Sequence, residues 1–254
     1  MVRNLLIRGM LTGVLAGVLA WVFAWVFGEP EVRNAIAFEE HESSAHGDHP
    51  EEEIVSRGVQ STIGMLTGVG VYGIAIGGLF ALVFAFAYGR IGPFKPRATA
   101  GLLALLGFVV VIVVPFLKYP ANPPAVGDPD TIGRRTTLYF GMVALSVLFT
   151  AAAVLLARHL APRLGAWNAI PIAVAAFVAA VGLAMWAMPT VNEIPAEFSA
   201  PVVWRFRMAS LGMHAIIWTT FGLLFGLLAE RVLFPTTEVN QPTQIPAPPT
   251  PAGV

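Results

Sequence analysis

Imidazole and carboxylate groups gather in one polar stretch of the chain, residues 28–61, which we expect to be an acidic loop. Nitrogen and oxygen ligands together suit borderline divalent cations such as cobalt, nickel and zinc better than soft copper(I). The histidine spacings match no closed structural zinc pattern, and nothing in the sequence fixes the ring orientations. A solvated acidic segment without metal is therefore as good an interpretation as a segment that collects a cation. The groups that could bind metal in this stretch are Glu39, Glu40, His41, His46 and His49.

A second set of polar groups lies in residues 118–136, the most polar short connection of the chain. Its prolines exclude a helix and favour turns, and its acidic and basic residues favour an ordered loop that pairs with itself. The alternative is a water-facing junction, because an exposed ion pair contributes only about 0–1 kcal/mol. A later polar segment, residues 189–209, adds an amide and a carboxylate. We expect Asp128, Asp130, Asn192 and Glu193 to form the mouth of a cation path.

His214 is the only ionisable group, apart from tyrosines, within the apolar runs of the chain. An ionisable residue in a membrane span is by default a functional hypothesis, so His214 is a candidate ligand just below the mouth. A neutral imidazole bonded to a backbone carbonyl near the helix end explains it equally well. The runs contain no Asp or Glu, which disfavours ion coupling within this chain, and no Walker loop is present to bind ATP.

The composition is that of a membrane protein. Of the 254 residues, 56% are hydrophobic and 12% are charged, whereas about 25% are charged in soluble domains. The formal net charge is zero and basic residues do not cluster with aromatic ones, so nucleic acid is excluded as a partner. No cysteine is present for a disulfide, a thiolate metal site or a thiol nucleophile.

Six apolar runs are each about as long as a helix needs to be to cross a hydrocarbon layer about 30 Å thick. We therefore predict an all-α polytopic membrane protein, a bundle of six transmembrane helices within an integral membrane domain, residues 1–234. Residues 235–254 are rich in proline, and we expect them to be a disordered cytoplasmic tail. The predicted spans are residues 5–27, 63–88, 98–117, 137–156, 169–188 and 211–228.

The charge distribution gives the orientation. The short connections 89–97 and 157–168 carry basic residues and no acidic ones, while most of the 15 acidic residues lie on the other side of the predicted bundle. Because basic loops stay in the cytoplasm, we predict that both termini are cytoplasmic.

Small residues recur at helical spacing in the first two runs. Gly9, Gly13 and Gly17 lie on one helix face, and the pairs Gly64/Gly68 and Gly73/Gly77 do the same in the second run. Such faces let helices approach closely. They predict either packing within the chain or a homo- or hetero-oligomer through glycine-rich faces.

Enzymatic activity has little support. The sequence holds no His-Glu-x-x-His and no Gly-x-Ser-x-Gly, the motifs of zinc proteases and of serine hydrolases. Catalysis at the membrane surface by Asp128, Asp130 and Glu193 is conceivable and ranks below transport. We expect no enzyme and no permanently bound cofactor.

The residues also resemble a known family. The segment Phe-Leu-Lys-Tyr-Pro-Ala-Asn-Pro-Pro-Ala-Val-Gly-Asp-Pro-Asp-Thr-Ile-Gly-Arg-Arg-Thr, residues 116–136, is similar to the signature loop of the CbtA-type probable cobalt transporter subunits. The likeness extends over nearly the whole chain up to Glu230. Further similar segments are residues 35–40, 77–85, 191–195 and 204–212.

The resemblance implies a multi-pass subunit in the bacterial inner membrane, proposed to import cobalt for cobalamin synthesis. It also implies a small partner with a single span and a histidine-rich end. Chemistry alone allows nickel or zinc as the transported ion, and only the resemblance selects cobalt(II). The alternative function is a membrane scaffold or accessory subunit that transports nothing and binds a partner helix.

Overall fold

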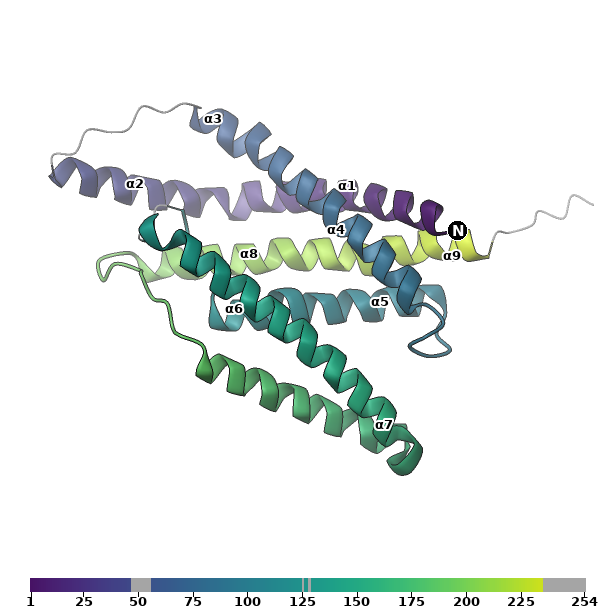
Figure 1. Ribbon diagram of the computed structural model, residues 1–254. Coiled ribbons are helices and arrows are strands. Elements are labelled where there is room, and N and C mark those ends of the chain that lie inside the picture. Colours follow the sequence, from purple (N-terminus) through teal and green to yellow (C-terminus); the bar gives the residue numbers. More distant parts are fainter. Residues whose placement is uncertain (47–55, 125, 128, 235–254) are drawn as a thin grey trace, which may run out of the picture.

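Long helices make up most of the chain in the computed structural model, which describes residues 1–46, 56–124, 126–127 and 129–234 (Figure 1). Within these residues the regular structure is helical and no strand occurs. The predicted all-α fold class is therefore confirmed. The predicted tail, residues 235–254, lies outside the described residues.

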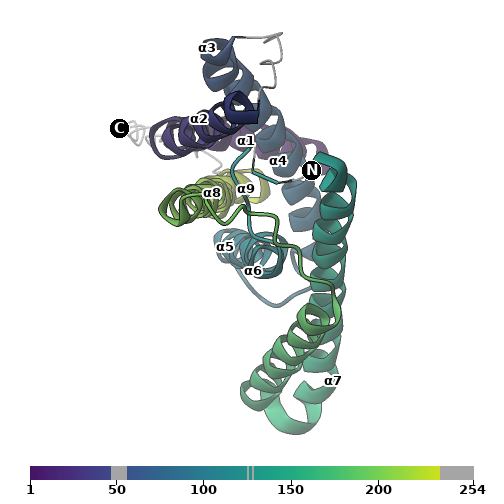
Figure 2. The ribbon, with the colours of Figure 1, turned by 90° about the vertical axis from the view of Figure 1, so that its left-hand side faces the viewer.

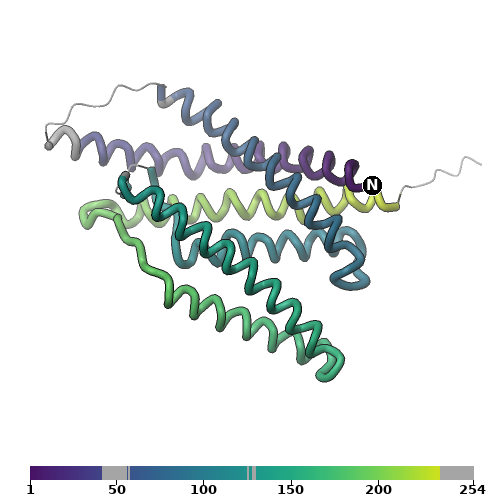
Figure 3. Tube along the Cα trace, viewed as in Figure 1, coloured from purple at the N-terminus to yellow at the C-terminus, as the bar shows by residue number. Residues whose placement is uncertain are grey.

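The helices follow the order of the predicted apolar runs. The first half of the chain forms α1 (Val2–Phe27), α2 (Glu29–His46), α3 (Arg57–Val59), the π-helical turn η1 (Gln60–Gly64), α4 (Met65–Ala87) and α5 (Pro96–Gly107). The second half forms the π-helical η2 (Phe108–Val113), α6 (Val114–Lys118), the short 3-10 turn η3 (Pro129–Thr131), α7 (Ile132–Ala187), α8 (Ala200–Thr220), the π-helical η4 (Phe221–Phe225) and α9 (Gly226–Leu233). Three continuous rods result: the first from α3, η1 and α4, the second from α5, η2 and α6, and the last from α8, η4 and α9 (Figure 3).

In the described part of the chain, 5 helical segments are long and apolar enough to cross a membrane. Each covers one or two of the predicted spans, apart from the last residues of two spans, Tyr88 and Met188. A multi-pass helical protein is therefore the architecture that length and hydropathy support. These segments are Val2–Phe27, Gln60–Ala87, Pro96–Lys118, Ile132–Ala187 and Ala200–Leu233.

The segment α7 accounts for the difference between these five segments and the six predicted spans. Its 56 residues would be about 84 Å long as a straight helix, far more than a bilayer core. The backbone leaves the helical region at Gly165, with φ 73° and ψ 155°, a conformation that glycine adopts without a Cβ clash. There the chain turns back, so α7 consists of two arms (Figure 1). The arms contain the predicted spans 137–156 and 169–188.

Part of the polar stretch 28–61, which we expected to be a loop, forms the helix α2. It continues from α1 across Gly28, whose N–H donates to the Ala24 carbonyl at 2.7 Å. Acidic residues in the first turn, Glu29 and Glu31, favour helix formation there because they face the positive end of the helix dipole. An apolar cluster then holds α2 against the start of α8. Its members are Ala35, Phe38, Val126, Ile194, Phe198, Val202 and Val203.

The crossing of α1 and α4 is a contact between backbones. Gly9, Gly13 and Gly17 are buried in α1, as predicted for that face. A β-carbon at Gly9 would overlap the carbonyl of Gly77, and one at Gly13 would overlap the carbonyl of Gly73. This glycine face is therefore used within the chain, and it is not available to a partner helix as the oligomer interpretation required.

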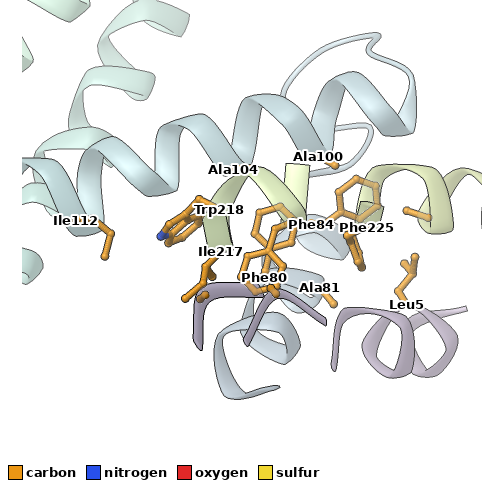
Figure 4. Close-up of a cluster of buried hydrophobic side chains, with 14 residues drawn as sticks. Leu5, Phe80, Ala81, Phe84, Ala100, Ala104, Ile112, Ile217, Trp218 and Phe225 are labelled. Carbon is orange, nitrogen blue, oxygen red and sulfur yellow. The ribbon is translucent and has the colours of Figure 1, made fainter. Parts of the chain in front are cut away.

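The main apolar cluster lies where α1, α4, α5 and the last rod meet. Phe80, Phe84 and Phe225 pack ring against ring, with centroids 5.2 and 5.3 Å apart for the Phe84–Phe225 and Phe80–Phe225 pairs. Figure 4 shows these rings together with Trp218, which lies toward Ile112. Gly107 makes room for Trp218, because a β-carbon there would overlap the indole ring.

Charge separates the two ends of the bundle. The N-terminus, the α4–α5 connection, the turn at Gly165 and the end of α9 lie at one end, where the connections 89–97 and 157–168 are basic and carry no acidic residue (Figure 1). There Arg8 donates to the Leu228 carbonyl at 3.0 Å, and Arg97 pairs with Glu230. At the other end lie α2, α3 and the connections on either side of α7. Figure 2 shows that the two arms of α7 extend away from the other helices.

Replacing Gly13 with alanine should weaken the α1–α4 crossing, because the new methyl group would overlap a carbonyl that cannot move away. We expect a loss of about 1–3 kcal/mol in unfolding free energy, seen as a lower melting temperature in detergent. Gly68→Ala is the matched control, since a β-carbon at that position would meet nothing within 4 Å. Equal melting temperatures for the two variants would contradict a backbone contact at Gly13.

Candidate functional site

The connection between α6 and α7 is held against the segment that follows α7. Arg135, in the first turns of α7, pairs with Glu193 through Nε and Oε2 at 3.2 Å, and both side chains are largely buried, at 29% and 18% exposure. Gly127 lies over this pair with φ 132°, and a β-carbon there would come within 2.8 Å of the Arg135 Nη1. This ion pair joins the loop to the next polar segment, a contact that the prediction of a loop paired with itself does not include.

Two further contacts fix the same loop. The hydroxyl of Tyr119 donates to the Pro189 carbonyl at 2.8 Å. Partial burial raises the pKa of Tyr119, so the hydroxyl keeps the proton that it donates. From α8, Arg207 donates through Nε to the Ala121 carbonyl at 3.2 Å and through Nη2 to Asn122 Oδ1 at 2.9 Å. The loop is therefore tied to α8 as well as to the segment after α7.

These contacts enclose a cavity of about 520 Å³ at the acidic end of the bundle. It lies between α6, the loop after it, the start of α7, residues 191–192 and α8. Its polar lining consists of Tyr119, Asn122, Arg135, Thr136, Tyr139, Asn192, Arg207, Ser210 and His214. Its apolar lining includes Ile112, Phe116, Ile132, Phe140 and Val191.

Helical spacing explains why α8 contributes a polar stripe. Arg207, Ser210 and His214 are three and four residues apart, which places them on one face, one above the other. Arg135 and Tyr139 do the same on α7. The cavity thus leads from guanidinium groups at its outer end to an imidazole deeper in the bundle.

His214 lies against one tyrosine at the inner end of this stripe and lines the cavity together with another. Its ring lies 5.8 Å from the ring of Tyr72, centroid to centroid, at an interplanar angle of 74°. Tyr139, from α7, lines the same cavity. The Nδ1 atom of His214 is buried and has no hydrogen-bond partner in the described part of the chain. A buried nitrogen without a partner is costly, so this atom is a candidate ligand position.

The sequence indicated His214 but not its neighbours. Tyrosines within the apolar runs were set aside, although Tyr72 and Tyr139 are two of only 4 in the chain. A tyrosine carries a polar hydroxyl that needs a partner in an apolar span, and that was the available signal. Arg207 belongs to the polar segment 189–209, and no sequence signal indicates its hydrogen bonds to residues 121–122.

The structure places the predicted metal ligands in two separate regions. Glu39, Glu40 and His41 are exposed on α2, where Glu40 and the buried Glu29 line a second cavity of about 630 Å³. His46 is the last residue of α2, and the predicted ligands His49 and Asp128 lie outside the described residues. Asp130 is exposed in η3, and Glu193 pairs with Arg135 beside the first cavity. Among the described residues, no three His, Asp or Glu side chains are grouped so as to hold a metal ion.

The length and hydropathy of the helical segments indicate a multi-pass helical membrane protein. The comparison with protein families makes this more specific. Residues 2–230 match the family described as probable cobalt transporter subunit (CbtA), so the chain belongs to that family. Neither the search of curated proteins nor that of solved structures gave a match.

Replacing Glu193 with glutamine should loosen the loop that closes the cavity, because Arg135 would keep its charge and lose its carboxylate. We expect a loss of about 1 kcal/mol in unfolding free energy, together with faster tryptic cleavage after Arg134. The exposed Glu197→Gln is the control. If both variants melt and are cleaved like the unmodified chain, the pair does not hold the loop.

Proposed function

We propose that the chain is the membrane subunit of a cobalt transporter and that it passes the cation inward from its acidic end. The observation that carries this proposal is the family match over residues 2–230, which covers every helix that borders the cavity. The family is that of a transporter subunit, and no catalytic role is proposed for the polar groups of the cavity.

Collection of the cation is assigned to the acidic end. Carboxylates concentrated on one face raise the local concentration of cations and steer them toward that face. The segment carrying Glu39, Glu40, His41, His46 and His49 would hold the ion transiently with oxygen and imidazole ligands. Asp128, Asp130 and Glu193 would then guide it toward the cavity. Two observations support this order: Glu39, Glu40 and His41 are exposed on α2, and α2 lies at the same end of the bundle as the Arg135–Glu193 pair beside the cavity.

Passage is assigned to the stripe on α8. Asn192 and Ser210 offer oxygen ligands, and His214 offers a nitrogen that no other described group occupies. This set suits Co²⁺, and it also suits Ni²⁺ and Zn²⁺. Family membership supports cobalt among the three.

The proposed topology has six crossings, with the two arms of α7 counted separately and both termini in the cytoplasm of a bacterium. It is supported by the reversal at Gly165 and by the basic residues at the end that holds the N-terminus. A small single-span partner with a histidine-rich end would complete the transporter. The scaffold alternative is weakened, because the glycine face of α1 on which it relied is occupied by α4.

The orientation can be tested with a reporter fused after Val254. We expect alkaline phosphatase, which is active only outside the cytoplasm, to be inactive at this position, while a fluorescent protein that folds in the cytoplasm should be bright. Insertion of the phosphatase after Gly127, at the opposite end, is the matched control and should give activity. The reverse pattern would contradict cytoplasmic termini.

Transport can be tested by cobalt uptake in cells that express the chain with and without its partner subunit. We expect uptake to depend on the chain, and we expect His214→Ala to lower it about tenfold or more, because a ligand is lost from the path. The triple variant His41→Ala, His46→Ala, His49→Ala should lower uptake mainly at limiting cobalt. Uptake that never depends on the chain would refute the transporter function. Normal uptake by the triple variant alone would refute only the collecting role.

A further inference from the structure

We propose that the cavity beside His214 receives the divalent cation as a chelate with a small carboxylate ligand, and not as the hydrated ion alone. This inference rests on the proposed function and specifies the chemical form of its substrate. Its evidence is the charge, the size and the arrangement of the groups that line the cavity.

The charge of the lining favours an anion. Two guanidinium groups, Arg135 and Arg207, line the cavity, and none of its described lining residues carries a carboxylate. The charge of Arg135 is balanced by the carboxylate of Glu193, which does not itself line the cavity. The described partners of Arg207 are the neutral oxygens of Ala121 and Asn122. A bare divalent cation in the cavity would therefore be repelled by Arg207, and repulsion between like charges is strong where water is partly excluded.

Arg207 has the geometry to bind a carboxylate. A guanidinium carries five N–H donors in a planar fork, and the two hydrogen bonds to residues 121 and 122 use one donor on Nε and one on Nη2. The donors on Nη1 remain, with a second donor on Nη2 beside them. Such an edge matches the two oxygens of a carboxylate.

The size of the cavity fits a chelate. A hydrated ion with six waters occupies about 180 Å³, if each water takes about 30 Å³. The cavity of about 520 Å³ is far larger. It falls in the range of about 300–1,000 Å³ that is usual for small-molecule sites.

The arrangement of the stripe gives the chelate two ends. His214 lies seven residues beyond Arg207 on α8, a rise of about 10 Å along the helix axis. The unpartnered Nδ1 of His214 suits a metal ion, while Arg207 suits a free carboxylate on the same ligand. A tricarboxylate such as citrate would bring its metal with one net negative charge, which complements the lining.

The test is isothermal titration calorimetry on the full chain in detergent with three probes: cobalt chloride, sodium citrate and the one-to-one cobalt–citrate complex. We expect the complex to bind about tenfold more tightly than either probe alone. Arg207→Gln should abolish that advantage, because a charged hydrogen-bonded pair is worth about a factor of ten or more. Arg207→Lys, which keeps the charge, should retain part of it. The control Arg205→Gln should retain all of it, since Arg205 is 64% exposed and pairs with Glu31 on α2.

The calorimetry tests the chelate inference, and cobalt uptake in cells tests the proposed function separately. Cobalt chloride binding as tightly as the complex, or citrate alone doing so, would overturn the chelate inference, as would an unchanged preference in Arg207→Gln. Loss of binding when an anionic phospholipid is added to the micelles would also overturn it, since a lipid headgroup would then be the occupant. The three probes on the unmodified chain decide the matter even if Arg207→Gln does not fold. The proposed function fails separately, if cobalt uptake in cells does not depend on the chain.

Discussion

The close contact between the backbones of α1 and α4 is the constraint on which the rest of the bundle depends. Lipid tails are as apolar as leucine, so helices in a membrane gain little from burying apolar side chains against one another, and they associate by close packing. Gly9 and Gly13 against Gly77 and Gly73 give that packing without side chains between the helices. With α4 fixed in this way, Phe80 and Phe84 reach the rings of the last rod, and Tyr72 reaches His214. One glycine crossing thus sets the positions of both the core and the inner end of the cavity.

At the acidic end, charged side chains replace close packing. Arg135 and Arg207 hold two connections that are far apart in the sequence, through Glu193 and through residues 121–122. Partly buried ion pairs and hydrogen bonds of this kind hold irregular backbone in place where water reaches one side. They also leave the cavity lined with polar groups. The same contacts therefore stabilise the loop and determine what the cavity can bind.

Much of this fold could be predicted from the sequence, because apolar length and small-residue spacing are local signals. The predicted spans coincide with the observed helices apart from one residue each at Tyr88 and Met188, and the glycine face of α1 is buried as expected. The sequence could not show that α2 is a helix packed on α8, since that depends on contacts of Ala35 and Phe38 with residues after 190. Nor could it bring Tyr72, Tyr139 and His214 together from three helices. For the candidate site, the sequence supplied His214 and the paired Glu193, whereas Arg207 acquires its importance only through tertiary contacts.

The π-helical turns η2 and η4 limit which insertions and deletions the two rods that contain them can accept during evolution. Each wide turn holds an additional residue compared with an α-helix, so the two halves of a rod are rotated by about a hundred degrees relative to a continuous helix. In the last rod this lets Arg207 and His214 face the cavity while Gly226 and Ala229 pack toward α5. Removing Gly222 would leave a regular helix with every apolar side chain retained, yet the two halves of the rod would be rotated away from the faces they now present. Homologous chains should therefore tolerate substitution in this turn far better than a change in its number of residues.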